Sequence, residues 1–274
     1  MKQIGIFLDS GAFSAWKQGT EIDLQEYIDF IKNNEKWITH YTCLDVIRNP
    51  EQTWLNQLEM IRQGLNPIVV FHKKENYRWL KKYIRKFDYI GLGGVAGDME
   101  IGETENHLDR CFDIICDQPS RLPKVKVHGF GVTINRLLFK YPWYSADSST
   151  WIMTSRRGII LLPRYTCGKA DYRKPPRRIE ISSKSPHKKT DMAHYTTLSK
   201  MERKKVRDYV ESLGLKIGVS EFDQKGNEII IEKGVCNTFR HRDIINYWYY
   251  YQLWLRLPKK PFPFKSTKAQ LFTV

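Results

Sequence analysis

The sequence predicts an α/β fold in which parallel strands alternate with helices. A TIM-type (β/α)8 barrel, regular or irregular, is the first choice, and an open doubly wound sheet is the alternative. Two observations lead to this prediction. Short apolar runs alternate with stretches of helical periodicity over residues 4–162, which is typical of repeated βαβ units. The 274 residues also suit a single barrel domain spanning 1–274.

The individual elements follow from the apolar pattern. Strands are expected at residues 4–8, 37–44, 67–71, 89–92, 125–127, 143–146 and 159–162, with two later ones at 216–220 and 228–232. Helices are expected at 23–32, 50–63, 76–86, 103–116, 133–138, 198–213 and 239–257. Pro50 suits the first turn of its helix and Gly64 ends it. The aromatic-rich C-terminal helix is expected to pack against the barrel through one face, formed by Phe239, Ile244, Tyr247, Tyr251 and Trp254.

The chain is strongly basic, with 45 Lys and Arg against 30 Asp and Glu, a formal charge of +15. This excess goes beyond what solubility needs and indicates a polyanionic partner, of which nucleic acid is the usual one. Residues 164–195 form the most basic stretch, and Pro175-Pro176 favours a loop or extended arm there. Such an insertion can track phosphates, although a solvated loop is the alternative. The candidate contacts are Arg173, Lys174, Arg177 and Arg178.

Neither a secretion signal nor a membrane-length apolar run is present in the sequence, so a cytoplasmic location is expected. The five cysteines are odd in number and widely spaced, which argues against a disulfide framework. Only Cys167 and Cys236 follow Asp147, they lack the spacing typical of metal ligands, and no cofactor is expected. A zinc site built from Cys167, Cys236 and His241 remains the alternative.

Reactive or flexible residues come directly after the predicted strands: Asp9, Asp45, His72, Gly93-Gly94, His128-Gly129 and Asp147. In a barrel the carboxyl ends of the strands meet on one face, where active sites lie. Any one aspartate could instead cap the helix that follows it, and either histidine could be a hydrogen-bonded core residue. Three aspartates at equivalent places, however, predict a shared site.

A site of this kind suits chemistry at a nucleoside. One carboxylate can attack C1′, a centre that develops oxocarbenium character, and a second can act as acid or base towards the leaving base. A third can accept hydrogen bonds from a purine edge. Gly93 and Gly94 can offer backbone N–H groups, Ser10-Gly11 lets the backbone approach closely, and Phe13 can stack on the heterocycle.

Four motifs resemble the tRNA-guanine transglycosylases over roughly residues 1–160. Asp9-Ser10-Gly11-Ala12-Phe13 is similar to that family's aspartate-serine-glycine-glycine-aromatic signature. The others are, in order, Ile90-Gly91-Leu92-Gly93-Gly94-Val95-Ala96 for its base-binding loop, Gly129-Phe130-Gly131-Val132 for its glycine-x-glycine element, and Ala146-Asp147-Ser148 for its nucleophile. The ordered set is more specific than any single motif.

The resemblance implies a role for each matching residue. Asp147 would be the nucleophile and Asp9 the general acid and base. The base would be bound by Asp45, Ser10, Gly11, Phe13, Gly93, Gly94, Val95, His128 and Gly129. Arg156 and Arg157, shortly after the nucleophile, could contact the phosphates that flank the reacting nucleotide.

The chain departs from the tRNA enzymes in lacking their cysteine-x-cysteine-x-x-cysteine zinc motif and in being shorter. Both departures resemble compact phage-type relatives, which insert 7-deazaguanines such as preQ0 into DNA. The expected function is therefore replacement of guanine in DNA by a 7-deazaguanine. The alternatives are the same exchange on tRNA, a DNA glycosylase or nucleoside hydrolase, and a non-catalytic basic DNA-binding protein.

Overall fold

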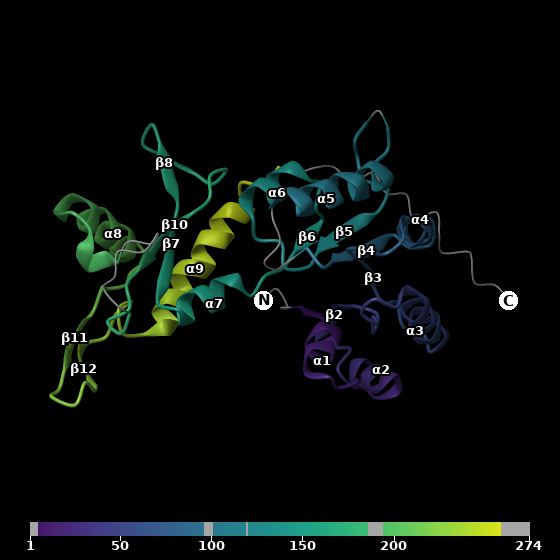
Figure 1. Ribbon diagram of the computed structural model, residues 1–274, viewed down its shortest axis with the longest axis horizontal. Helices are drawn as coiled ribbons and strands as arrows, with labels where there is room; N and C mark the ends of the chain where they lie inside the picture. The colour runs from purple at the N-terminus through teal and green to yellow at the C-terminus, as the bar shows by residue number, and fades with distance from the viewer. Residues whose placement is uncertain (1–4, 96–100, 119, 186–193, 259–274) are drawn as a thin grey trace. The chain divides into compact units, whose positions relative to one another are not determined.

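The computed structural model describes residues 5–95, 101–118, 120–185 and 194–258. Four parts of the predictions lie outside these ranges: Ile4 of the first strand, Ala96 of the glycine loop, residues 186–193 of the basic arm and the tail 259–274. The chain divides into two compact units (Figure 1). Unit 1 comprises Met1–Val132, Tyr141–Asp147 and Lys259–Val274, and unit 2 comprises Thr133–Lys140 and Ser148–Pro258.

Unit 1 is built on parallel strands that pair in the order of the sequence. They are β1 (Ile6–Leu8), β2 (Ile38–Tyr41), β3 (Val69–His72), β4 (Tyr89–Gly93), β5 (Lys126–Gly129) and β6 (Ser145–Ala146). A single parallel bridge between Thr42 and Ile68 joins β2 to β3. The predicted α/β class with parallel strands is therefore confirmed, and the boundaries differ from the predicted ones by a few residues.

This sheet is strongly curved. Phe7 of β1 stacks on His128 of β5 with ring centroids 4.3 Å apart, whereas four strand spacings in a flat sheet would separate them by about 19 Å. Phe7 also stacks on His40 of β2, and His40 meets Tyr89 of β4 edge to face. Tyr89 bonds to Ser145 of β6, and Ser145 bonds to His128. Side chains from five strands thus form a closed ring of contacts inside the curve.

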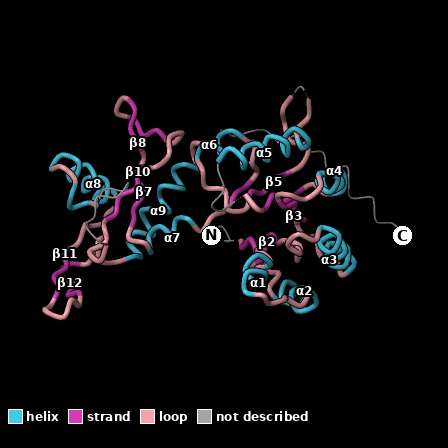
Figure 2. The backbone as a smooth tube through the Cα atoms, in the orientation of Figure 1, coloured by secondary structure: helices cyan, strands magenta, loops and turns pink. Residues whose placement is uncertain are grey.

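Helices connect these strands (Figure 2): α1 (Ala12–Gln18), α2 (Leu24–Asn33), α3 (Pro50–Arg62), α4 (Tyr77–Lys86) and α5 (Ile101–Ile115). Their starts follow the sequence closely, since Asp23, Asn49 and Asn76 each accept a backbone N–H as N-cap residues. Of these five helices, α1 alone was not predicted. It begins behind Gly11, whose positive φ of 76° glycine adopts readily, so the tight turn after Asp9 leads straight into a helix.

Unit 2 has a different architecture. It contains α6 (Asn135–Lys140), α7 (Thr150–Arg156), β7 (Ile159–Leu162), β8 (Arg164–Thr166), β9 (Lys169–Asp171), β10 (Arg177–Glu180), a 3-10 turn (Tyr195–Thr197), α8 (Lys200–Ser212), β11 (Val219–Phe222), β12 (Glu228–Glu232) and α9 (Phe239–Trp254). The predicted strand 159–162 exists as β7, but it pairs antiparallel with β10 and does not continue the parallel series. All four of its residues are buried.

The basic arm is more regular than predicted. Residues 164–171 form the β8–β9 hairpin, and residues 177–180 form β10. The apolar partners of this part of unit 2 include Ile160, Ile179, Val206 and Ile245, which share one buried cluster. The arm is thus anchored to unit 2 through β10.

The prediction for the C-terminal helix was wrong about its buried face. In α9 the buried residues are Arg242, Ile245, Asn246, Tyr249 and Leu253. The predicted packing residues are exposed instead, namely Phe239, Ile244, Tyr247, Tyr251 and Trp254. Buried polar groups explain the difference, because Arg242 and Asn246 bond to backbone carbonyls of neighbouring elements and cannot face solvent without losing these bonds. Among the described residues, none of the helices has the length and apolar character of a membrane span.

Candidate functional site

Asp45 is the most constrained of the three aspartates. It lies four residues beyond β2, and its side chain is buried. Ser10 Oγ donates to its Oδ1 at 2.7 Å, and His72 Nε2 donates to its Oδ2 at 2.7 Å. Ser10 Oγ also accepts from the backbone N–H of Ala12 at 3.2 Å, which fixes the turn at the start of α1. One carboxylate therefore ties together the ends of β1, β2 and β3.

Asp9 follows β1 directly and reaches solvent. Burial of part of the carboxyl group raises the pKa of Asp9, and the carboxylates of Asp45 and Asp147 raise it further. Backbone N–H groups of Ser10 and Gly11 act in the opposite direction. The structure therefore brings both Asp45 and Asp147 within electrostatic reach of the accessible Asp9. A raised pKa makes the Asp9 carboxyl group better suited to proton transfer than an ordinary aspartate.

Asp147 follows β6 directly, and about half of its side chain, 52%, is exposed. The backbone N–H of Gly131 donates to its Oδ1 at 2.6 Å. Gly131 has a positive φ of 67°, so the glycine-x-glycine element supplies a turn that aims an N–H group at this carboxylate. His128 Nε2 lies 3.9 Å from the same oxygen. Asp147 is thus oriented from one side and open to a ligand on the other.

His128 is almost fully buried, with 3% of the residue exposed. Burial lowers the pKa of His128 to about 4, so the imidazole is neutral at pH 7. Its Nδ1 lies 2.7 Å from Ser145 Oγ, which lies 2.5 Å from the Tyr89 hydroxyl. Its Nε2 has no hydrogen-bond partner among the described residues. Phe7 stacks on the ring and Phe130 packs against it edge to face, so the imidazole is held in place.

The two predicted glycines after β4 have different roles. Gly93 is buried, and a Cβ there would lie 2.7 Å from His72 Nδ1, so this position must be small to make room for the imidazole that holds Asp45. Gly94 is exposed and has a φ of 70°, which leaves its backbone accessible. The neighbouring Val95 side chain is buried. Gly129 is packed, because a Cβ there would lie 2.8 Å from the Trp143 ring.

Phe13 lies in the first turn of α1, and 54% of it is exposed. Its ring stacks loosely on Trp16 at 6.1 Å, and Lys17 Nζ lies over it at 4.6 Å. These contacts are all within α1. The Phe13 ring is therefore accessible for the predicted stacking on a base. The aromatic side chains that pack against His128 in the site are Phe7 and Phe130.

The residues that support this site were not predicted from the sequence. Glu75 Oε2 accepts from the backbone N–H of His72 at 3.2 Å, while its buried Oε1 has no partner among the described residues. Burial raises the pKa of Glu75 to about 7. Ser145, Tyr89 and Phe7 were missed as well. Two of them could have been found from the strand period of two. Ser145 lies two residues before Asp147 and Phe7 lies two residues before Asp9, so each shares a strand face with its aspartate.

The predicted nucleic-acid contacts all lie in unit 2. Arg156, Arg157, Arg173, Lys174 and Arg178 are exposed. Arg177 is half-buried and pairs with Glu202 of α8 at 2.6 Å, so it also holds β10 against that helix. Lys174 Nζ is 3.0 Å from Thr166 Oγ1 and 3.8 Å from Asp171.

The alternative zinc ligands are spread over unit 2. Cys167 is exposed in the β8–β9 turn, Cys236 follows β12 and His241 lies in α9. Within the described ranges, no three His, Cys, Asp or Glu side chains are grouped so that they could hold a metal ion.

The comparison with known proteins adds no relative: no protein-family model matches the sequence, and no curated protein matches it. Function is therefore inferred from the geometry of the site and from the motif resemblance.

Proposed function

We propose that this protein is a base-exchange glycosyltransferase, which replaces guanine in DNA with a 7-deazaguanine derivative through a covalent aspartyl-glycosyl intermediate. The observation that carries the proposal is the meeting of Asp9, Asp45 and Asp147 at the carboxyl ends of β1, β2 and β6. Asp147 follows Asp9 by more than a hundred positions in the sequence, yet its charge, like that of Asp45, raises the pKa of Asp9. The resemblance to the guanine transglycosylases assigns the same three positions to catalysis and base recognition.

The three environments suit three roles. Asp147 is exposed and oriented by the Gly131 N–H, as a nucleophile that attacks C1′ must be. Asp9 is exposed and has a raised pKa, which suits a group that gives and takes a proton. Asp45 is buried and bonded through both oxygens, so it acts as a fixed acceptor whose remaining lone pairs meet the purine edge.

The reaction proceeds in two displacements. An Asp147 oxygen bonds to C1′ while the C1′–N9 bond of guanosine breaks, and Asp9 gives its proton to the departing guanine. The incoming 7-deazaguanine then loses its N9 proton to Asp9. Its N9 bonds to C1′ as the ester bond to Asp147 breaks. One glycosidic bond replaces another, so the exchange needs neither an oxidant nor a nucleotide triphosphate.

His128 has a role in this scheme as a neutral donor. When Tyr89 donates to Ser145 and Ser145 donates to His128 Nδ1, the single imidazole proton resides on Nε2. That nitrogen faces Asp147 at 3.9 Å. A donor there stabilises the carboxylate each time it is released from the sugar, and the stacked Phe7 keeps the ring aligned.

A barrel is the architecture that we propose for unit 1. Six parallel strands in sequential order, curved until β1 and β5 side chains touch, support it. DNA is the proposed substrate because of the net charge of +15 and the compact, phage-like sequence pattern. A duplex hides C1′, so the target nucleotide must be unpaired or flipped out.

The test is an Asp147→Asn variant incubated with DNA and a labelled 7-deazapurine, followed by mass spectrometry of the released nucleosides. We expect base exchange to fall by at least about a thousandfold, as loss of a nucleophile does in other enzymes, while DNA affinity changes little. Asp29→Asn, on the exposed side of α2, is the matched control and should keep full activity.

Each rival gives a different result in this assay. Exchange into tRNA but not into DNA would show that the substrate is tRNA. Release of guanine without any incorporation would indicate a hydrolase. Unchanged exchange in Asp147→Asn would reject the assigned nucleophile. A DNA-binding protein without catalysis would show no exchange in the unaltered chain.

A further inference from the structure

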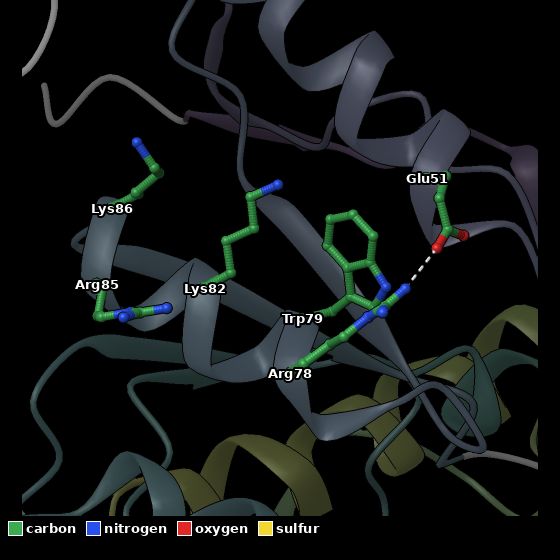
Figure 3. A pocket seen from close by; sticks show the side chains of 6 residues that line it. All are labelled: Glu51, Arg78, Trp79, Lys82, Arg85 and Lys86. Carbon is green, nitrogen blue, oxygen red and sulfur yellow. Dashed lines mark hydrogen bonds and ion pairs between the residues drawn. The ribbon is translucent and has the colours of Figure 1, made fainter.

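An open, basic hollow of about 730 Å³ lies on the outer surface of unit 1, over α4 and the start of α3 (Figure 3). Four of its six lining residues are cations, and one is a carboxylate. The lining consists of Glu51, Arg78, Trp79, Lys82, Arg85 and Lys86. Figure 3 shows the Arg78 guanidinium directed towards Glu51, to which it is paired at 2.9 Å. None of the chemistry proposed above uses this surface.

The cations form a row along one face of a helix. Arg78, Lys82 and Lys86 are spaced by four residues, and Arg85 stands beside the last of them. With a rise of 1.5 Å per residue, the row is about 12 Å long. The sequence of α4 contains no Asp or Glu, so the helix itself supplies no neutralising charge.

The surroundings of Lys82 keep its ammonium group close to the other cations of the row, although like charges repel. Its Nζ lies 3.7 Å from the Trp54 ring centroid and 4.5 Å from that of Trp79, so the ammonium group rests on two indoles. Burial lowers the pKa of Lys82, and the neighbouring charges of Lys86 and Arg78 lower it further. An anion placed in the hollow would relieve this repulsion.

We propose that this hollow, defined by Arg78, Lys82, Arg85 and Lys86, binds the phosphate backbone of the nucleic-acid substrate. The inference rests on the proposed function in taking nucleic acid as the substrate. One strand of a duplex presents a phosphate for about every 3.4 Å of helix axis, so a row about 12 Å long covers the axial rise of about three of them. A single nucleotide would leave most of the row unpaired, which favours a polynucleotide over a small phosphate ligand.

The proposed contact recognises the phosphate backbone and does not distinguish base sequence. Trp79 is only 8% exposed, and the indole of Trp54 lies beneath the Lys82 ammonium group, so neither ring is open to a base. Phosphate contacts fix position and add salt-dependent affinity without distinguishing bases.

The test compares two triple variants of the full chain in DNA binding. Lys82→Gln/Arg85→Gln/Lys86→Gln removes three charges from the hollow. Lys32→Gln/Lys36→Gln/Lys124→Gln removes three exposed charges elsewhere in unit 1 and is the matched control. Affinity for a fluorescent duplex of mixed sequence is measured by anisotropy between about 50 and 200 mM KCl, the range over which phosphate contacts dominate.

The hollow variant should show a slope of log K against log salt that is smaller by about 2.7, at about 0.9 for each phosphate contact. Over this salt range the unaltered protein would then lose about 40-fold more affinity than the variant. The control should keep the original slope. Equal slopes in the hollow variant and the control would overturn the proposal, as would binding of inorganic phosphate to the hollow with no difference in DNA slope.

A double variant guards against unfolding. Arg85→Gln/Lys86→Gln leaves Lys82 on its indoles and should lower the slope by about 1.8. Its thermal unfolding should match that of the unaltered chain. Base exchange is not part of this assay, so the two proposals can fail separately: a smaller slope in a protein without exchange rejects only the enzyme, and exchange with an unchanged slope rejects only the hollow.

Discussion

The three aspartates of the site differ because their surroundings differ. Asp45 accepts one hydrogen bond on each oxygen, Asp147 accepts one from a backbone N–H, and the charges of Asp45 and Asp147 raise the pKa of Asp9. Residue type alone would give all three the same behaviour. Their division into acceptor, nucleophile and proton carrier therefore depends on the neighbours that the fold supplies.

The raised pKa of Asp9 makes its protonation sensitive to Asp45. Asp45→Asn removes a negative charge that raises the Asp9 pKa, so Asp9 should lose its proton at lower pH. We expect kcat/KM for DNA to fall as Asp9 deprotonates, and the midpoint of that fall to move to lower pH in the variant. A pH profile of kcat/KM measures the shift, with Asp29→Asn as the control. An unmoved midpoint would remove Asp9 from the proton-transfer step.

The raised pKa of Glu75 should make the free energy of unfolding depend on pH. Its pKa is raised from 4.5 to about 7 by burial, so the folded protein binds more protons than the unfolded chain between these values. Stability from this group is fully present below pH 4.5 and is lost as the pH rises towards 7. Glu75→Gln should remove that loss, and its stability relative to the unaltered chain should improve by up to about 3 kcal/mol between pH 5 and pH 8. Urea unfolding at both pH values measures this, and an equal difference at the two would contradict it.

At the scale of elements, the sequence predicted what local patterns control. The apolar runs, Asp23, Asn49 and Asn76 specify strands and helix starts directly, and most elements of unit 1 were found within a few residues. The positions of Asp9 and Asp147 after their strands also followed from pattern. The pairing partners of the strands did not follow from the sequence pattern, because a buried apolar run such as Ile159–Leu162 fits a parallel or an antiparallel neighbour equally well.

The prediction of the buried face of α9 was wrong for a physical reason. Hydrophobic periodicity selected its aromatic side chains, but buried hydrogen bonds decided the orientation of the helix. The supporting residues Glu75, Ser145 and Tyr89 were missed for a related reason. Their importance comes from contacts between strands that no spacing along the chain reveals.

Asn246 of α9 is fully buried and joins three elements of unit 2. Its Oδ1 accepts from the Leu161 N–H at 2.8 Å, and its Nδ2 donates to the carbonyls of Ile159 at 3.0 Å and Trp151 at 3.2 Å. Asn246→Ala leaves these backbone groups unpaired, which should lower the stability of unit 2 by about 2–4 kcal/mol.

Hydrogen exchange with mass spectrometry measures this effect by unit. Protection should fall in α9 and β7 and remain in β3 to β5 of unit 1, because the two units have separate cores. Asn33→Ala, at an exposed position of α2, should change protection little. A uniform loss across both units would show that they unfold together.

At the scale of the whole molecule, the aspartate site and the cations of the basic arm are carried by different parts of the chain. The aspartate site lies within unit 1, and the exposed cations Arg173 and Arg178 lie within unit 2. Arg177, between them in sequence, is already paired with Glu202. Catalysis and this part of DNA affinity should therefore be separable by mutation.

Arg173→Gln/Arg178→Gln should lower the salt slope of DNA binding by about 1.8, from two phosphate contacts at about 0.9 each. The rate of base exchange at saturating DNA should stay within about twofold, because neither residue touches the reacting atoms in the proposed scheme. Lys225→Gln/Lys233→Gln removes two exposed charges from the β11–β12 region of unit 2 and is the matched control. Asp147→Asn should show the opposite behaviour, with exchange lost and the slope unchanged. If the arginine variant instead abolished exchange at saturating DNA, these side chains would have to act in the chemical step, and the assignment of catalysis to unit 1 alone would be wrong.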